Sequence, residues 1–333
     1  MKNSGSLIKP ITLLWLAFAA IPVMSAFCPS LAQAQLPARF YLKSLSDSNG
    51  VPLIVESING NTNPFDPAHN VTAGADFNAT MALLGYARTF SLYDRAAMAA
   101  VIMPMGRISG NVTVAGRSIN QSTDGFGDPM IEFDINVFGP PAQKNIPDVL
   151  RYEPGLSIDL LVDLALPIGE YDSSKPLNLG QNRWYGRVGM PVIWQLGPWV
   201  PGRRTTLEFL PTLWLFGDNT DYVGKTLKTN PIFQLDSHLT RDLTENFWGS
   251  LDATWFYGGR SKINGESGKQ RNDFGVGVTL GYQINDNLNM TFGYKSTIDD
   301  KAPDALRMNV FMVSLVYGWH PLVEGMKRLQ GEK

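Results

Sequence analysis

The stretch LSIDLLVDLALPIGEYD, residues 156–172, alternates apolar and polar side chains with a period of two. One parity is aliphatic from Leu156 to Leu166, and the other carries Asp159 and Asp163. This period is typical of a β-strand with one apolar face and one face that carries carboxylates. A soluble β-sandwich would bury the aliphatic face, whereas an outer-membrane barrel turns that face toward lipid and the carboxylates toward a polar lumen. The strand alone leaves both architectures open.

Similar alternation recurs along most of the chain. No segment after Gln35 has eighteen uninterrupted apolar residues, so the sequence predicts no transmembrane helix beyond that point. With the opening stretch we count about twelve strands, an even number, as bacterial single-chain barrels have. The other eleven expected strands cover residues 38–46, 72–90, 95–108, 131–137, 183–196, 207–215, 227–239, 250–257, 274–283, 288–294 and 307–317.

The links between these strands fall into two length classes. Short links occupy residues 91–94, 197–202, 242–245 and 285–287. Longer polar links occupy residues 47–70, 109–124, 173–182, 217–226, 258–270 and 296–306. Short turns on one rim and long loops on the other are typical of an outer-membrane barrel whose long loops face outward. The link 139–154 is long where this rule predicts a short turn.

Aromatic residues gather near both expected rims, where amphipathic rings would lie at headgroup depth. The alternative is that aromatic residues are simply common in strands. The expected inner belt is Phe138, Trp199, Phe247, Tyr282 and Trp319, and the expected outer belt is Tyr171, Trp184, Phe216, Tyr257 and Tyr294.

The N-terminus has the pattern of a secretory signal peptide. Two lysines precede a short apolar core at residues 11–23, and Ala32-Gln33-Ala34 supplies a small-x-small cleavage site. We therefore expect a signal peptide at 1–34, a barrel at 35–320 and a periplasmic tail at 321–333. The single cysteine, Cys28, falls within the segment expected to be removed, which suits an oxidising export route.

The charge balance restricts the partners. Lys and Arg number 28 against 30 Asp and Glu, which gives a formal net charge of -2 and no basic face for a nucleic acid. The expected partners at this point are the lipid bilayer of a Gram-negative outer membrane and its assembly machinery. The assembly signal is expected near residues 310–319, and passive passage requires no cofactor.

Three motifs resemble a known family. The segments GFGDP at 125–129, LPIGEYD at 166–172 and NLGQNRW at 178–184 are similar to patterns of the phenol meta-degradation (MetA-pathway) family of outer-membrane transporter barrels. The resemblance implies a barrel that moves hydrophobic or aromatic small molecules inward, with no catalytic residues to carry over. The motif positions are Gly125, Gly127, Asp128, Leu166, Pro167, Gly169, Tyr171, Asp172, Gly180, Asn182, Arg183 and Trp184.

The inward parity of the expected strands places charged residues in the lumen. Opposite charges on neighbouring strands can form a ladder of pairs that tunes solute passage, or they can satisfy one another in a filled lumen. The predicted lumen residues are Glu132, Asp134, Asp159, Asp163, Arg183, Arg187, Glu208, Asp236, His238 and Asp252.

Other functions stay open at this point. Ser250, His238 and Asp252 on one inward face allow an outer-membrane hydrolase, although no nucleophile motif surrounds the serine. Only three histidines exist, and they lie far apart in sequence, so no zinc site is predicted. A structural or adhesive surface barrel with a plugged lumen is the main alternative to a channel.

Overall fold

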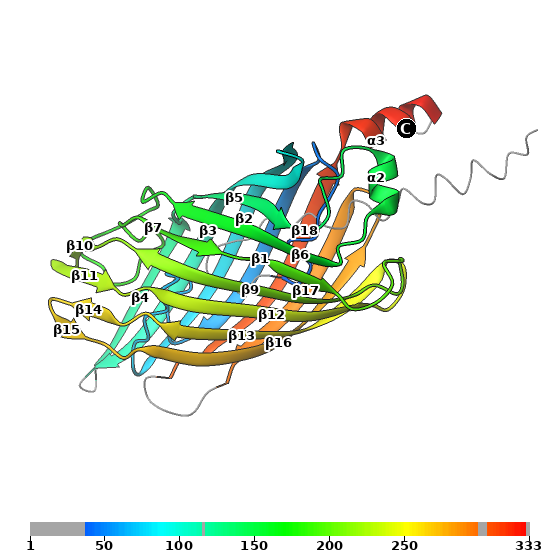
Figure 1. Ribbon diagram of the computed structural model, residues 1–333. Helices are drawn as coiled ribbons and strands as arrows, with labels where there is room; N and C mark the ends of the chain where they lie inside the picture. Colours follow the sequence, from blue (N-terminus) through cyan, green and yellow to red (C-terminus); the bar gives the residue numbers. More distant parts are fainter. Residues whose placement is uncertain (1–36, 115–116, 299–304, 331–333) are drawn as a thin grey trace, which may run out of the picture.

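The barrel has twelve strand positions around its wall. The computed structural model describes residues 37–114, 117–298 and 305–330, so the expected signal peptide lies outside the described residues. Fourteen strands form one antiparallel sheet (Figure 1), and two wall positions are each shared by two strands, β4 with β5 and β7 with β8. The wall strands are β1 (Asn49–Gly60), β2 (Ala75–Leu92), β3 (Arg95–Val114), β4 (Arg117–Phe126), β5 (Met130–Phe138), β6 (Leu156–Ala165), β7 (Tyr185–Gly189), β8 (Val192–Gln195), β9 (Thr205–Phe216), β12 (Ile232–Asp242), β13 (Phe247–Gly258), β16 (Arg271–Gln283), β17 (Leu288–Thr297) and β18 (Met308–Trp319).

The sheet closes on itself through its first and last strands. β1 pairs with β18 over its whole length, from Asn49 opposite Trp319 to Gly60 opposite Met308. Closure gives each wall strand a partner on both sides for its backbone groups, except β4, which pairs with β3 alone among the described strands. The twelve-stranded antiparallel barrel expected from the alternation is confirmed.

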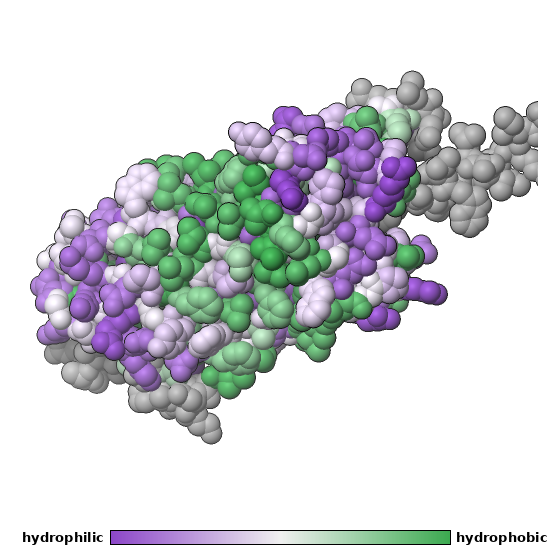
Figure 2. Space-filling view, in the orientation of Figure 1, coloured by the Kyte–Doolittle hydropathy of each residue, from purple (hydrophilic) through white to green (hydrophobic). Residues whose placement is uncertain are grey.

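The outer surface carries an apolar band. On β6, Leu160 and Val162 are about half exposed, whereas Asp159 and Asp163 are 1% and 3% exposed. Figure 2 shows apolar side chains across the middle of the barrel, with polar side chains at both ends. An apolar exterior around a charged interior is the reverse of a soluble sandwich, and it places this barrel in a lipid bilayer. Among the described helices, none is long and apolar enough to cross a membrane.

The expected first strand at 38–46 was wrong. That stretch is not a strand but lies inside the barrel, with most of its side chains buried. Its two cations, Arg39 and Lys43, each reach carboxylates of the lumen. The true first strand, β1, falls in the stretch expected to be a long loop at 47–70.

Several expected loops contain structure. Residues 109–114 and 117–124 extend β3 and β4 as paired strands beyond the outer rim, and residues 227–229 belong to an outer strand rather than to the wall. A four-stranded sheet stands over the long-loop rim and is formed by β10 (Asn219–Tyr222), β11 (Lys225–Thr229), β14 (Ser261–Ile263) and β15 (Glu266–Ser267).

Two helices lie at the opposite rim (Figure 1). The unusually long link there contains α2 (Ile146–Arg151), and α3 (Pro321–Gln330) follows the last strand. Lys327 of α3 forms a 2.7 Å ion pair with Asp286 in the turn between β16 and β17. The C-terminal tail is therefore held against this rim, and its periplasmic position stays a prediction.

Replacing Leu160 by arginine tests the lipid-facing assignment. Leu160 lies near the middle of β6 and is 51% exposed, so Leu160→Arg puts a charge in the hydrocarbon layer. We expect a loss of about 2–4 kcal/mol in the free energy of unfolding, measured by denaturant titration in lipid vesicles. Ser122→Arg is the control, because it places the same charge on β4 beyond the outer rim and should be neutral. Equal effects of the two substitutions would contradict a membrane-embedded β6.

Candidate functional site

The ten residues predicted to line the lumen are all inside the barrel. Each is at most 6% exposed. Arg187 contacts Asp163 on the neighbouring strand and lies 3.9 Å from Glu132, as a cross-strand ladder requires. Arg183 instead pairs with Asp66, a residue of the β1–β2 loop. Several lumen charges therefore find their partners on segments that are not part of the wall.

The N-terminal segment, residues 37–48, fills the lumen at the α2 and α3 end. The guanidinium of Arg39 lies 2.5 Å from Asp242, and its backbone N–H donates to Glu208 over 2.7 Å. The ammonium of Lys43 contacts both Asp134 and Asp159. Ion pairs rather than strand pairing thus hold this segment in place.

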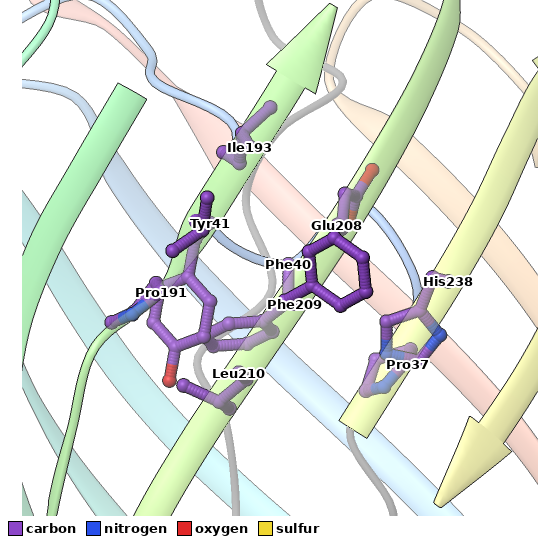
Figure 3. Close-up of a pocket in the computed structure, with 10 residues that line it drawn as sticks. Pro37, Phe40, Tyr41, Pro191, Ile193, Glu208, Phe209, Leu210 and His238 are labelled. Carbon is purple, nitrogen blue, oxygen red and sulfur yellow. The ribbon is translucent and has the colours of Figure 1, made fainter. Parts of the chain in front are cut away.

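The space that remains beside the N-terminal segment is small. A cavity of about 20 Å³ lies between this segment and β8, β9 and β12 (Figure 3). Phe40 and Tyr41 form its inner wall, and Glu208 and His238 contribute polar atoms. Such a volume holds about one water molecule.

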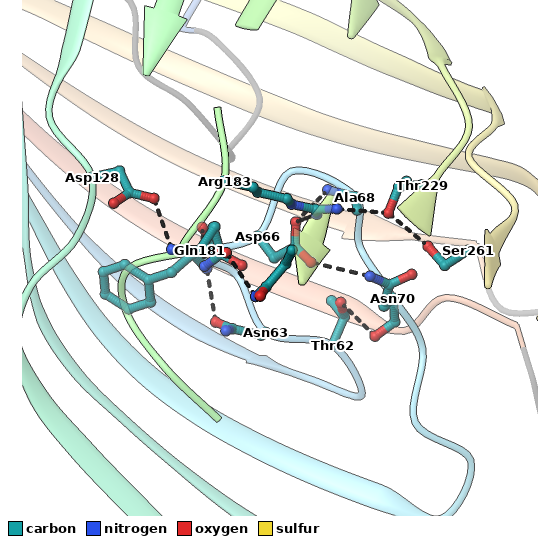
Figure 4. Close-up of polar contacts among 12 residues, drawn as sticks. Thr62, Asn63, Asp66, Ala68, Asn70, Asp128, Gln181, Arg183, Thr229 and Ser261 are labelled. Carbon is teal, nitrogen blue, oxygen red and sulfur yellow. Dashed lines mark hydrogen bonds and ion pairs between the residues drawn. The ribbon is translucent and has the colours of Figure 1, made fainter. Parts of the chain in front are cut away.

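The inserted loop, residues 61–74, fills the lumen at the opposite end. Phe65, Ala68 and His69 are each at most 2% exposed. The ring of His69 meets the ring of Phe256 edge-on, with centroids 5.1 Å apart. Asp66 accepts a 2.9 Å hydrogen bond from Arg183 and one of 3.1 Å from Asn70 (Figure 4). A long outer loop is thus folded into the barrel.

The family-like motifs come together beneath this loop. Asp128 accepts the backbone N–H of Gly169 over 2.9 Å and that of Gln181 over 2.7 Å. A Cβ on Gly169 would lie 2.5 Å from the carbonyl carbon of Gly127, and one on Gly180 would lie 2.7 Å from that of Gly169. Glycine is therefore required where three backbone segments touch.

The same motif region holds the inserted loop. The side-chain amide of Gln181 donates to the carbonyl of Phe65 over 3.1 Å, and that of Asn63 donates to the carbonyl of Asn178 over 2.7 Å. The remaining polar motif residues tie the outer loops to one another, because the hydroxyl of Tyr171 donates to Asp221 and Asn182 donates to Asn219. Most motif residues thus shape the outer end of the lumen.

Three motif positions lie at the edges of this region. Trp184 is 54% exposed on the outward parity, where a rim aromatic was expected. Asp172 is on the surface, and hydrogen bonds from Ser174 and Lys175 lower the pKa of its carboxyl to about 2. Leu166 donates its backbone N–H to Pro129, which continues the pairing of β5 and β6 past the last ladder residue.

The sequence did not reveal an aromatic vestibule at the outer end of the lumen. We use this name for Tyr185, Trp214, Phe216 and Phe256, which surround the inserted loop. The expected belt position of Phe216 was wrong, because its ring stacks on Tyr185 inside the barrel at 6.5 Å. Parity contained the signal, since Trp214 and Phe216 share the inward parity of Glu208 on β9.

The geometry at His238 does not form a hydrolase triad. Nδ1 of His238 lies 2.7 Å from Asp252, and the hydroxyl of Ser250 donates to that same carboxylate over 2.6 Å. A triad requires the serine to hydrogen-bond the histidine. Within the described residues, no group of three His, Cys, Asp or Glu side chains is placed to hold a metal ion.

Comparison with known proteins gives a family and a fold. The family model described as "Putative MetA-pathway of phenol degradation" matches residues 60–315. The chain belongs to this family. Among solved structures, the COG4313 outer membrane channel from Pseudomonas putida F1 is similar at 14% identity and a TM-score of 0.65, over 88% of this chain and 100% of that one.

Other solved barrels have a lower structural similarity to this chain. The translocator domain of autotransporter NalP from Neisseria meningitidis reaches a TM-score of 0.46 at 10% identity, over 81% of this chain and 88% of that one. No curated protein matches the sequence. The closed barrel and its apolar exterior, together with the channel's fold, make this chain an outer-membrane β-barrel.

Acid should loosen the inserted loop through His69. Burial lowers the pKa of this imidazole to about 4, although Asp66 opposes the shift. A released His69 titrates near its ordinary pKa of about 6.5, so the docked loop is disfavoured as the pH falls below that value. At pH 5 we expect docking to weaken by about 2 kcal/mol.

Hydrogen exchange of the loop amides measures this effect, after correction for the intrinsic exchange rate at each pH. His69→Phe is the control, because it keeps an aromatic ring against Phe256 and does not titrate there. The same pH response in both proteins would exclude His69 as the cause.

Proposed function

We propose that this barrel is a channel for uptake of hydrophobic or aromatic small molecules across the outer membrane. The observation that carries the proposal is the aromatic vestibule, which replaces the polar lining usual in a porin lumen. Ring faces offer apolar contact and stacking to a planar solute. Membership of a family linked to phenol degradation supports the same class of solute.

Passage through the barrel requires both lumen fillings to move. The inserted loop and the N-terminal segment are joined to the wall by hydrogen bonds, ion pairs and ring contacts, so both can leave without unpairing a wall strand. A solute would enter the vestibule as the loop lifts and continue past the displaced N-terminal segment. The predicted lumen charges would then line its path.

A structural or adhesive barrel is the second candidate. It is favoured by the filled lumen, in which cavities of only about 20 Å³ and 30 Å³ lie beside the N-terminal segment. The two functions differ in whether the inserted loop and the N-terminal segment ever leave the lumen.

Lys43→Met tests which function applies. The substitution removes the ammonium that joins the N-terminal segment to Asp134 and Asp159, and leaves two buried carboxylates that favour water in the lumen. We expect the initial uptake of radiolabelled phenol to rise several-fold in cells with an intact lipopolysaccharide leaflet. Uptake by wild type should already exceed that of cells without the protein.

Lys144→Met is the matched control. Lys144 forms a 2.6 Å ion pair with Asp94 at the same rim, but both side chains are about half exposed or more. Its loss should leave uptake unchanged, because an exposed pair contributes little. Uptake at the level of empty cells in wild type and both variants would favour the structural barrel.

A further inference from the structure

The inserted loop places one carboxylate and one ring in the vestibule. The carboxylate of Asp66 meets the guanidinium of Arg183, and the ring of His69 meets Phe256. Both groups belong to the same short loop, and two residues separate them in the sequence. The loop thus presents to the wall the two features of a small aromatic acid.

Arg183 is built to hold an anion. Its side chain is fully buried, its guanidinium lies 4.8 Å from the centroid of Phe216, and it donates to Thr229 over 2.8 Å. Asp66 engages only one of its terminal nitrogens, and Nε is buried without an acceptor among the described residues. A carboxylate that approached side-on would take both Nε and that terminal nitrogen, which is the stronger arrangement.

Arg183 depends on the inserted loop for its counter-ion. Within the described residues its ion-pair partner is Asp66, whereas Arg187 is paired with Asp163 on the wall. The other nearby carboxylate, Asp128, already accepts two backbone N–H groups. When the loop leaves, a buried guanidinium loses its counter-ion while Phe216, Trp214 and Phe256 lose their cover.

We propose that the vestibule binds planar aromatic monocarboxylates, which displace the inserted loop by supplying a carboxylate to Arg183 in place of Asp66. The ring of the solute takes the position of His69 against the aromatic wall. This inference rests on the proposed function for the solute path and narrows its solutes. A neutral aromatic molecule would fill the ring site but leave Arg183 unpaired, which is costly for a buried charge.

Asp66→Asn tests whether the loop carboxylate competes with the solute for Arg183. Asparagine keeps a hydrogen-bonding side chain toward Asn70 and Ala68, but it no longer neutralises Arg183. Because the loop carboxylate competes with the solute at a high effective concentration, its removal should tighten benzoate binding about ten-fold. Isothermal titration calorimetry on the purified full-length barrel in detergent measures the dissociation constant.

Arg183→Gln is the complementary variant. It should weaken benzoate binding at least about ten-fold, because a charge-assisted fork is lost. Benzyl alcohol, which has the ring without the charge, should not bind more weakly in Arg183→Gln, because it forms no ion pair with the guanidinium. Arg88→Gln is the control, since Arg88 forms an exposed ion pair with Asp47 far from the vestibule.

The outcomes distinguish this inference from the channel itself. Tighter benzoate binding in Asp66→Asn supports it even if Arg183→Gln fails to fold, which heat-modifiable migration on gels reports. Unchanged benzoate binding in Asp66→Asn overturns it, as does acetate that binds as tightly as benzoate. Phenol uptake by cells without a carboxylate preference in calorimetry would remove this inference and keep the channel. Benzoate binding without uptake of phenol or benzoate would remove the channel and keep the site.

Discussion

Burial of charge inside a closed barrel is the constraint on which the rest of the structure depends. Once β1 pairs with β18, the inward face of every strand is shut off from lipid and, where the lumen is filled, from bulk water. Isolated charges there are costly, so each must find an opposite charge or hydrogen-bond donors. The wall supplies some partners, as Arg187 does for Asp163. Lys43 and Asp66 come from segments that only occupy the lumen.

This division has a mechanical consequence. A partner on a wall strand cannot leave without breaking the backbone ladder, whereas a partner on a loop or terminal segment can exchange for water or for another ion. The wall pair of Arg187 and Asp163 therefore stabilises the barrel itself. The ion pair between Arg183 and Asp66 and the one between Asp159 and Lys43 stabilise only a particular filling of the lumen. The barrel therefore contains both pairs that hold its wall together and pairs that can be exchanged.

The period of two determined how much could be predicted. It assigned each wall residue to lipid or lumen, so Leu160 and Asp159 were placed correctly before any strand partner was known. It could not tell a wall strand from a segment that lies inside the lumen, where residues 38–46 include turns and almost every side chain is buried. Residues 38–46 were misplaced for this reason. The inward folding of residues 61–74 depends on contacts with Arg183 and Phe256 that no local pattern contains.

The motifs illustrate the same limit from the other side. Their glycines and Asp128 were recognised by their spacing in the sequence. That spacing does not explain why glycine or aspartate is needed at these positions. The structure supplies one, because Gly127, Gly169 and Gly180 let three backbone segments touch while Asp128 accepts two of their N–H groups. That contact fixes the start of β7 and with it the position of Arg183, whose guanidinium lies over Phe216 on the next strand.

The two ends of the lumen differ in which part of the chain carries the cation. Each end has a guanidinium over an aromatic ring, because Arg183 lies 4.8 Å from the ring of Phe216 at one end and Arg39 lies 4.7 Å from the ring of Trp248 at the other. Arg183 lies just before the wall strand β7, whereas Arg39 belongs to the N-terminal segment. When the fillings leave, the first pair of cation and ring stays with the wall and the second is lost. The vestibule is therefore the end that keeps both features in an emptied lumen.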